Sequence, residues 1–325
     1  MIRDITNMRE GNFIKQNIKR WESYQEPTDD PDEVAKRFTY LVDDLSYAKT
    51  FYPFSNTVRY INSFAAAIYL SIYKNRKEKS NRFITFWKQE LPMVMYRNRS
   101  TLLFSFLFFL TFVLIGIFSA ANDQTFIRAI LGNEYVDMTE HNIANGDPFG
   151  VYKSGNPFVM FIRIAYNNIS VSFLCFTTGL LLSTGTIYEL FTNGLMVGAF
   201  EYMFVQHHLG FQSVLVTFTH GTLELSAIVI AGCAGIGLGN SLLFPGTYTR
   251  LRSLMRAAKD GVKIITGLIP VFITAALFEG FVTRHTEMPV VLNLFILITS
   301  LGFILWYFVW YPYRVNKKIS NAGHE

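Results

Sequence analysis

The sequence predicts an all-α protein: a polytopic α-helical membrane protein with about six transmembrane helices and a cytoplasmic N-terminal helical domain. Half of the 325 residues are hydrophobic and only 16% are charged. The charges are unevenly distributed, because residues 1–100 carry 29 of the 53 and long uncharged runs fill the remainder. Aromatic residues, at 16%, suit lipid-facing and interfacial surfaces. These observations exclude a disordered chain and argue against a soluble single-domain enzyme.

Each predicted span is a nearly uncharged run that can cross about 30 Å of hydrocarbon. Ionisable residues bound these runs, because a charge at the bilayer centre costs about 2.5–3.5 kcal/mol on insertion scales. The membrane domain covers residues 100–315, with spans at residues 101–121, 164–186, 191–206, 211–243, 262–283 and 289–310. The third span is near the lower length limit and carries Glu201, so we expect it to be short, tilted or paired as a hairpin with the second. The fourth is long enough to be tilted or broken, and Pro270 is expected to kink the fifth.

Clusters of basic residues predict the orientation of these spans. They precede the first span, separate the fourth from the fifth and follow the sixth: Arg97 and Arg99; Arg250, Arg252, Arg256, Lys259 and Lys263; Arg314, Lys317 and Lys318. With six spans all three clusters fall on one side, which the positive-inside rule assigns to the cytoplasm. Both termini, including a tail over residues 316–325, are then cytoplasmic, and residues 122–160 form an outer loop.

Residues 1–99 are predicted to form a cytoplasmic domain of amphipathic helices. Asp30-Pro31-Asp32-Glu33 offers an N-cap, a proline at the first helical position and acids in the first turn. Apolar residues then recur at helical spacing from Val34 to Ala48, and a second helix is expected to begin near Asn56. Aromatic and basic residues interleave over residues 83–99, which indicates an interfacial helix leading into the membrane. These helices either pack only on one another or also offer a docking surface.

The strongest polar feature within the spans is Thr219-His220-Gly221-Thr222-Leu223-Glu224-Leu225. His220 and Glu224 are four residues apart, so they share a helix face and can pair directly. Such a pair favours a proton relay or an ion site, whereas an interhelical hydrogen bond that fixes packing is the structural alternative. Further embedded polar residues can converge with this pair on one site, or can serve as helix caps and packing contacts: Asn167, Asn168, Asn193, Glu189 and Glu201.

The spans carry no recognisable motif for a catalytic, cofactor or metal site. The spacing of His220 and Glu224 is not that of a zinc hydrolase, and Ser226 has no evident base with a nucleophile geometry. Cys175 and Cys233 lie in apolar runs and are expected to be structural. We therefore expect no enzymatic activity, no cofactor and no metal.

Small residues recur where spans can touch. Their spacing permits close helix contacts within the chain or between two copies, and we expect packing roles for Gly194, Gly198, Gly221, Gly232, Gly235 and Gly239. Gly232-Cys-Ala-Gly-Ile-Gly-Leu-Gly239 follows no strand, so it is not a nucleotide-binding loop.

An ordered set of motifs over residues 100–315 resembles the stage II sporulation protein M family. The set comprises Asn167-Asn168, Phe176-Thr-Thr-Gly179, Gly185-Thr186, Leu190, Asn193-Gly194, Gly198, His220-Gly221-x-x-Glu224-Leu225 and Ala227-x-x-Ile230-Ala231-Gly232. Thr219 stands where the family's usual motif has proline. The resemblance implies an integral protein of a bacterial or archaeal cytoplasmic membrane. The family's namesake acts in engulfment during sporulation with peptidoglycan-degrading partners, but the long N-terminal helices here are unlike that namesake.

Two functions follow as hypotheses. The first is a non-enzymatic integral component of a cell-envelope complex, with the N-terminal helices and outer loop as partner surfaces. The second is a small-solute or ion transporter or channel that uses the embedded His220 and Glu224. The expected partners are membrane lipid, envelope proteins and a second copy of the chain, and no nucleic acid, because the basic clusters flank apolar runs.

Overall fold

The computed structural model describes residues 8–26, 28, 30–74, 82–153 and 155–322, and all the regular structure in this part of the chain is helical. Two compact units divide the chain at Arg82–Phe83. The compact units divide earlier than the predicted domain boundary at residue 99. Three short elements before it, α4 (Arg82–Thr85), the π-helix η1 (Phe86–Glu90) and α5 (Leu91–Arg97), belong largely to the membrane unit.

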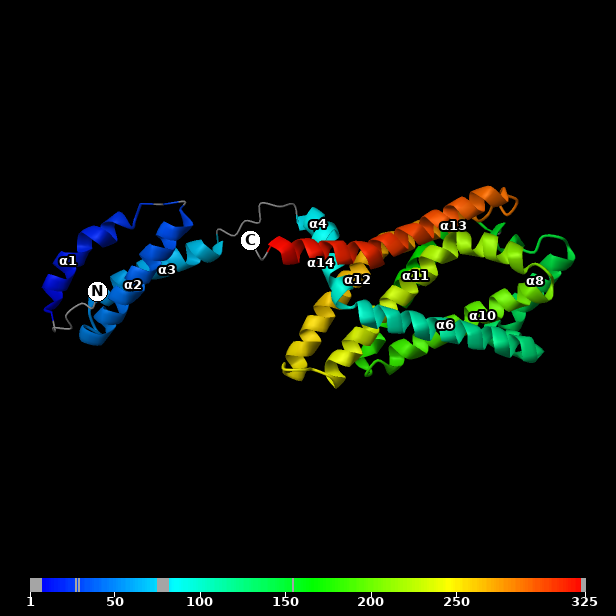
Figure 1. Cartoon of the computed structure of the whole chain (residues 1–325), viewed down its shortest axis with the longest axis horizontal. Helices are drawn as coiled ribbons and strands as arrows, with labels where there is room; N and C mark the ends of the chain where they lie inside the picture. The colour runs from blue at the N-terminus through cyan, green and yellow to red at the C-terminus, as the bar shows by residue number, and fades with distance from the viewer. Residues whose placement is uncertain (1–7, 27, 29, 75–81, 154, 323–325) are drawn as a thin grey trace. The chain divides into compact units, whose positions relative to one another are not determined.

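The N-terminal unit consists of α1 (Glu10–Ser23), α2 (Pro31–Phe51) and α3 (Asn56–Lys74) (Figure 1). The Asp30 side chain accepts a hydrogen bond from the Asp32 N–H, so the predicted N-cap is present at α2. Trp21, Leu41 and Ile61 are fully buried and join the three helices in one core. The periodicity of α2 and α3 predicts both helices, whereas α1 is an addition that the sequence pattern did not reveal.

A buried carboxylate ties α1 to α2 inside this core. Asp44 is 2% exposed and accepts a hydrogen bond from the Trp21 indole at 2.8 Å, and it also forms an ion pair with Arg20. Because the charge has both partners, its burial is compensated.

The membrane unit contains five helices that are long and apolar enough to cross a bilayer, among the described residues: Arg99–Asn122, Pro157–Leu180, Gly210–Leu243, Arg250–Val282 and Val290–Asn321. Two of the five are single α-helices: α6 (Arg99–Asn122) and α11 (Gly210–Leu243). Two end in a short helical turn of another type: α9 (Pro157–Thr177) continues into η3 (Thr178–Leu180), and α12 (Arg250–Leu277) continues into η4 (Phe278–Val282). The last is formed by α13 (Val290–Ile304), η5 (Leu305–Trp310) and α14 (Tyr311–Ala322). The structure thus shows an all-α membrane protein. Its fifth and sixth predicted spans largely coincide with parts of longer helices, and α14 includes residues 316–322 of the predicted tail.

Another long helix, α10 (Thr184–Gln206), occupies the place of the predicted third span. It starts at residue 184, not near 191, and its 23 residues extend about 34 Å at 1.5 Å per residue. The predicted second span ends too late, because α9 stops at Thr177 and a tight turn follows. Ser183 adopts a positive φ of 68° in that turn, and its hydroxyl donates to the Ile236 carbonyl at 3.1 Å. The α9–α10 hairpin is therefore held against α11.

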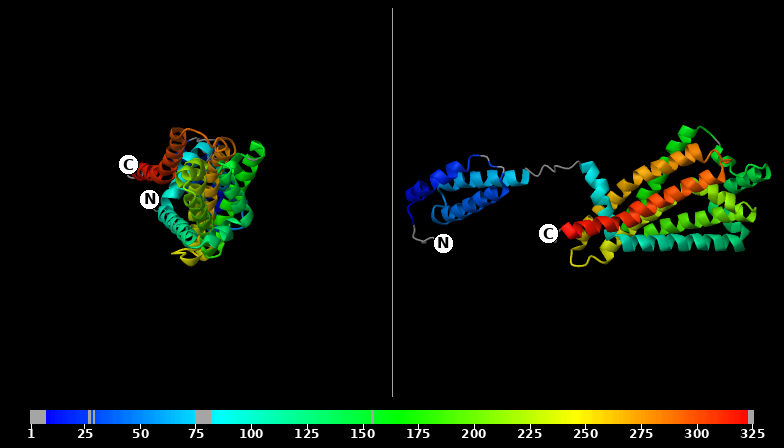
Figure 2. Two further views of the ribbon diagram at one scale, coloured as in Figure 1. Left: turned by 90° about the vertical axis from the view of Figure 1, so that its right-hand side faces the viewer. Right: turned by 45° about the horizontal axis from the view of Figure 1, so that its top comes forward.

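Helix α11 is the centre of the membrane unit. It packs on α6, α9, α10, α12 and α13, and most of its residues are buried (Figures 1 and 2). It continues without a break through Thr219, so the predicted fourth span is one unbroken helix. Helix α12 likewise continues through Pro270.

Glycines allow these helices to approach closely. Helix α6 runs beside α10 (Figures 1 and 2), and Gly194 and Gly198 face the α6 backbone. A Cβ atom at Gly198 would lie 2.8 Å from the Ile117 nitrogen. On α11, added Cβ atoms would collide with neighbouring elements at Gly232, Gly235 and Gly239. Gly221 differs, since its nearest neighbour would be Thr217 Cγ2 at 3.9 Å, and thus it is not a close-packing position.

The loop over residues 122–160 folds into α7 (Gln124–Leu131), α8 (Asn133–Ala144) and the 3₁₀ turn η2 (Gly150–Lys153). Arg128 joins the two helices through Asp137 at 2.5 Å and Glu140 at 3.1 Å. Phe149 stacks on Phe204 of α10 with ring centroids 5.1 Å apart. This loop is therefore a packed cap on the ends of α6 and α10.

Candidate functional site

The His220 imidazole of α11 is buried, with a hydrogen-bond contact at one nitrogen and a carboxylate near the other. Its Nδ1 atom lies 3.0 Å from the Thr283 hydroxyl, and its Nε2 atom lies 3.9 Å from Glu279 Oε2. The residue is 4% exposed, and Glu279 belongs to η4 at the end of α12. The two nearest partners of His220 thus come from η4 and the turn that follows it, and Glu224 is not one of them.

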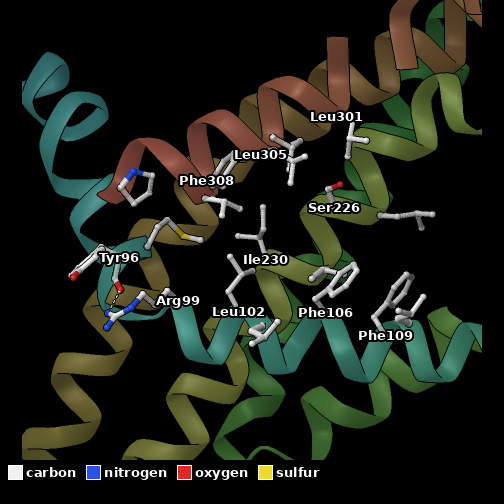
Figure 3. Close-up of a pocket in the computed structure, with 18 of the residues that line it drawn as sticks. Tyr96, Arg99, Leu102, Phe106, Phe109, Ser226, Ile230, Leu301, Leu305 and Phe308 are labelled. Atoms are coloured by element: carbon white, nitrogen blue, oxygen red, sulfur yellow. Dashed lines mark hydrogen bonds between the residues drawn. The ribbon is translucent and has the colours of Figure 1, made fainter. Parts of the chain in front are cut away.

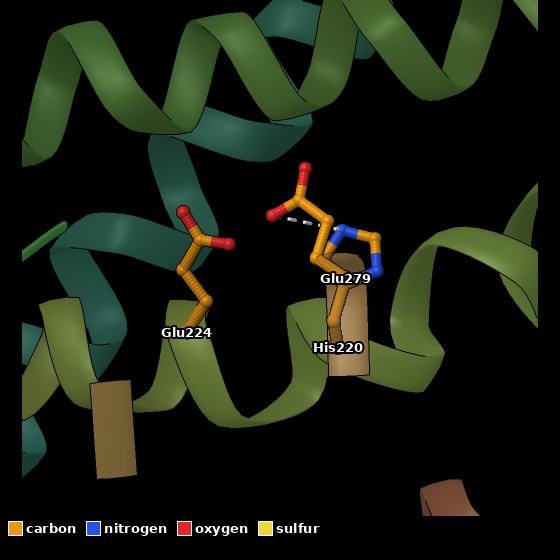
Figure 4. Close-up of side chains that lie close together, drawn as sticks. All are labelled: His220, Glu224 and Glu279. Carbon is orange, nitrogen blue, oxygen red and sulfur yellow. Dashed lines mark ion pairs between the residues drawn. The ribbon is translucent and has the colours of Figure 1, made fainter. Parts of the chain in front are cut away.

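Glu224 nevertheless joins this cluster from one turn further along α11. Ligand atoms of His220, Glu224 and Glu279 all lie within 4.8 Å of one another. In Figure 4 the two carboxylates point toward each other and the imidazole lies beside Glu279. Two carboxylates so close in a buried site repel, and a proton or a cation between them removes the repulsion. We call these three residues the central cluster.

Asn168 of α9 extends the central cluster. Its side chain is 3% exposed and lies beside the Glu224 carboxylate, and its Nδ2 atom is buried outside hydrogen-bond geometry. The neighbouring Asn167 is exposed on the other face of α9. Of the two asparagines predicted for the site, the structure therefore places only Asn168 there.

Glu189 and Asn193 lie elsewhere on α10. The Asn193 amide donates to the Glu189 carbonyl at 2.8 Å, which is a bond within one helix turn. Leu190, between them, packs against Gly232, and Gly232 is about 12 Å along α11 from Glu224 at 1.5 Å per residue. These two residues therefore do not converge with the central cluster.

Glu201 lies near the α10–α11 turn, in a second buried polar group. Both of its carboxylate oxygens, the Ser213 hydroxyl and the Thr217 hydroxyl are buried outside good hydrogen-bond geometry, although Ser213 lies beside the carboxylate. Tyr152 of η2 connects this group to the central cluster: its side chain lies among Thr217, Glu201 and Glu279, and its ring centroid is 5.6 Å from that of His220.

Sequence reasoning missed Glu279, Thr283 and Tyr152. Glu279 carries a signal, since it is an acidic residue within an apolar span, and such residues are functional candidates. The π-helical turn η4 that presents it is a second signal, but it is visible only in the structure. Nothing in the sequence indicates that Tyr152 reaches the site from the loop.

The central cluster has the donors of a metal site. Imidazole nitrogen and carboxylate oxygen both bind divalent metals, and the Thr283 contact at Nδ1 leaves Nε2 directed to Glu279. No metal ligand was expected from the sequence. These three residues can hold a proton or a metal ion.

The membrane unit also contains an apolar pocket of about 630 Å³ between α6, α11 and the last helix (Figure 3). Tyr96 and Arg99 lie at one end, where the Arg99 guanidinium donates to the Tyr96 carbonyl at 2.9 Å. Leu301 and Phe109 lie toward the other end. None of its lining residues belongs to the central cluster, so this apolar pocket and the ionisable site are separate.

The helices and the buried ionisable residues define a polytopic α-helical membrane protein with a polar centre. Residues 105–284 match the family described as Stage II sporulation protein M, and this match covers more than half of the chain. The chain belongs to that family, which confirms the resemblance seen in the motifs. The matched range contains the central cluster and Thr283.

The N-terminal unit has a separate match. Residues 11–74 match a domain of unknown function, DUF8413, and this range includes α2, α3 and most of α1. No match emerges among curated proteins or among solved structures.

Proposed function

We propose that this chain is a membrane transporter for small cations, protons included, with His220, Glu224 and Glu279 as its central binding site. The convergence of these three ionisable groups inside apolar helices carries the proposal. Ionisable residues within a membrane are costly and typically line ion or proton pathways. A positive charge between Glu224 and Glu279 offsets their repulsion, and its departure to either side is the transport step.

The surroundings of the central cluster support this function. The Thr283 contact orients the imidazole, so that Nε2 faces the carboxylate of Glu279. The cluster is shared between α11 and η4, so a change in the spacing of these two elements alters the affinity for a cation. Such a change is what alternating access to two sides requires.

We infer a six-span topology as part of this proposal. Helix α10 is long enough for a sixth crossing and packs along α6 and α11, although Glu189, Asn193 and Glu201 lower its hydropathy. With this crossing, the basic clusters fall on one side and both termini are cytoplasmic in a bacterial or archaeal membrane.

Flux through proteoliposomes tests the proposed function. The purified full chain is reconstituted with a pH-sensitive dye inside, and ion gradients of Na⁺, K⁺, Mg²⁺ or Mn²⁺ are imposed in turn. We expect proton or cation flux that His220→Ala, Glu224→Gln and Glu279→Gln each abolish. Glu189→Gln is the matched control, since Glu189 lies on a neighbouring helix away from the central cluster. Absent flux, or flux equal in all variants, refutes transport.

A second candidate is a non-enzymatic component of a cell-envelope complex. The N-terminal unit favours it, because this unit has its own three-helix core and its own family match, and neither is needed to carry a cation. Affinity capture of the full chain from gently solubilised membranes tests this candidate, with a chain that lacks residues 1–82 in parallel. We expect defined envelope proteins to co-purify with the full chain and to be lost from the chain that lacks residues 1–82. Recovery of the chain alone counts against this role.

A further inference from the structure

The polar group near the α10–α11 turn contains four oxygen atoms outside good hydrogen-bond geometry, with the Ser213 hydroxyl beside the Glu201 carboxylate and the Thr217 hydroxyl beside Tyr152. They are Glu201 Oε1 and Oε2, Ser213 Oγ and Thr217 Oγ1, and each is buried. Ser213 is 0% exposed, so water at the protein surface does not reach it. A buried polar atom without a hydrogen bond costs about 1–3 kcal/mol, and a carboxylate costs more. A group of buried oxygens that satisfy one another only incompletely can accept a cation.

Glu201 also lacks a basic partner. Among the described residues, no Lys, Arg or His forms an ion pair with its carboxylate. The Ser213 hydroxyl lies beside the carboxylate, and Tyr152 lies near both Glu201 and Thr217. The donors that surround the position are thus all oxygens, and their formal charge is −1.

This donor set selects the class of ligand. Carboxylate and hydroxyl oxygens suit hard cations. A monovalent cation neutralises one carboxylate, whereas a divalent cation leaves an uncompensated positive charge in a poorly solvated site. The absence of nitrogen and sulfur ligands disfavours transition metals.

The group has an approach from the hairpin end of α10 and α11. A hollow of about 510 Å³ is lined by Glu201, Val205, His208 and Phe211, among others. Glu201 thus contributes both to this hollow and to the buried oxygen group. We propose that Glu201, Ser213, Thr217 and Tyr152 form a binding site for a monovalent alkali cation, separate from the central cluster.

The site's position links it to the transport function. Tyr152 contacts His220 edge to face and lies near Glu279, so it separates the two polar groups by one aromatic ring. A cation bound at the Glu201 site can then move past Tyr152 to the central cluster. This link rests on the proposed function, but cation binding at Glu201 does not.

Thermal unfolding of the full chain in detergent tests the site. Choline chloride is replaced by NaCl or KCl at constant ionic strength, and the midpoint is followed by intrinsic fluorescence. We expect a midpoint that rises with Na⁺ or K⁺ and saturates, because a ligand that binds only the folded state stabilises it. Glu201→Gln should abolish the cation-dependent rise, and Thr217→Val and Ser213→Ala should weaken the apparent affinity about tenfold. Glu189→Gln should retain the wild-type rise.

A second measurement does not depend on the folding of a variant. It follows the binding of ²²Na⁺ to the wild-type protein and its competition by unlabelled Na⁺ and K⁺. Specific binding supports the site. Equal midpoints in choline, Na⁺ and K⁺ without ²²Na⁺ binding overturn it, as does a shift that Glu201→Gln preserves or that only Ca²⁺ or Mg²⁺ produces. If Glu201 is simply protonated and binds no cation, the midpoints are equal in choline, Na⁺ and K⁺ and no ²²Na⁺ binds. Cation-dependent stability that persists in His220→Ala, without flux, would refute transport and leave this site intact.

Discussion

The contact between α6 and α10 depends on the absence of a side chain at Gly198. A Cβ atom there would collide with the Val113 carbonyl oxygen, and it would lie 2.8 Å from the Ile117 nitrogen and 3.0 Å from the Gly116 carbonyl carbon. All three atoms belong to the α6 backbone, so no side chain can rotate away. Gly198→Ala must therefore push the two helices apart.

The size of the effect follows from two opposing terms. Extra volume in a tight contact lowers the free energy of unfolding by about 1–3 kcal/mol. Because the neighbouring backbone atoms are rigid, we expect Gly198→Ala to cost about 3 kcal/mol from this term. Alanine regains about 1 kcal/mol over glycine within a helix. We expect a net loss of about 2 kcal/mol in the free energy of unfolding.

Gly302→Ala on α13 is the matched control, because a Cβ atom there has no neighbour within 4 Å. This variant should gain up to about 1 kcal/mol from helix propensity alone. SDS titration in mixed micelles, with helicity as the signal, compares the two variants. If Gly198→Ala is as stable as Gly302→Ala, close backbone packing does not hold α6 to α10.

Three further predictions concern single contacts. Asp44→Ala removes the acceptor for the buried indole of Trp21 and the ion-pair partner of Arg20. It should lower the free energy of unfolding of the N-terminal unit by about 1.5–3 kcal/mol in chemical denaturation. Tyr307→Phe removes a hydroxyl that donates to an η1 carbonyl at 2.8 Å, and should raise amide exchange in residues 86–97 while protection of α11 is unchanged. Hydrogen bonds from Ser55 and Thr57 lower the pKa of Glu10 below its ordinary 4.5. The stabilisation they provide is therefore complete above pH 4.5 and is lost as the pH falls through the lower folded-state pKa, and Glu10→Gln should flatten this acid transition of α1 in hydrogen exchange.

Local signals predicted the helices that depend on local chemistry. The Asp30-Pro31 start and the apolar spacing of α2 are present as expected, and the long apolar runs became helices of membrane-spanning length. The start of α10 was missed because residues 184–186 fall within the predicted second span and the charge of Glu189 marks the predicted boundary between the second and third spans. Ser183 and the Gly179 contact with α11 create the actual turn, and both depend on a helix that follows later in the chain.

The candidate site was predicted only on one helix. Spacing places His220 and Glu224 on a common face of α11, but it cannot say which helix lies opposite. Glu279 is 59 residues further along, and packing of α12 on α11 brings it to the imidazole. The failure at Asn167 has the same origin, because adjacent residues on α9 point to different faces and periodicity alone does not select the buried one.

The π-helical turn η1 widens the helix just before the membrane. The Tyr307 hydroxyl donates to the Trp87 carbonyl in this turn, and the Tyr311 hydroxyl donates to the Lys88 carbonyl at 3.2 Å. Donor and acceptor are more than 200 residues apart in the chain. During synthesis the acceptors are made first and stay without these partners until the last helix has emerged. The turn that precedes the first span is thus among the last parts of the membrane unit to receive its partners.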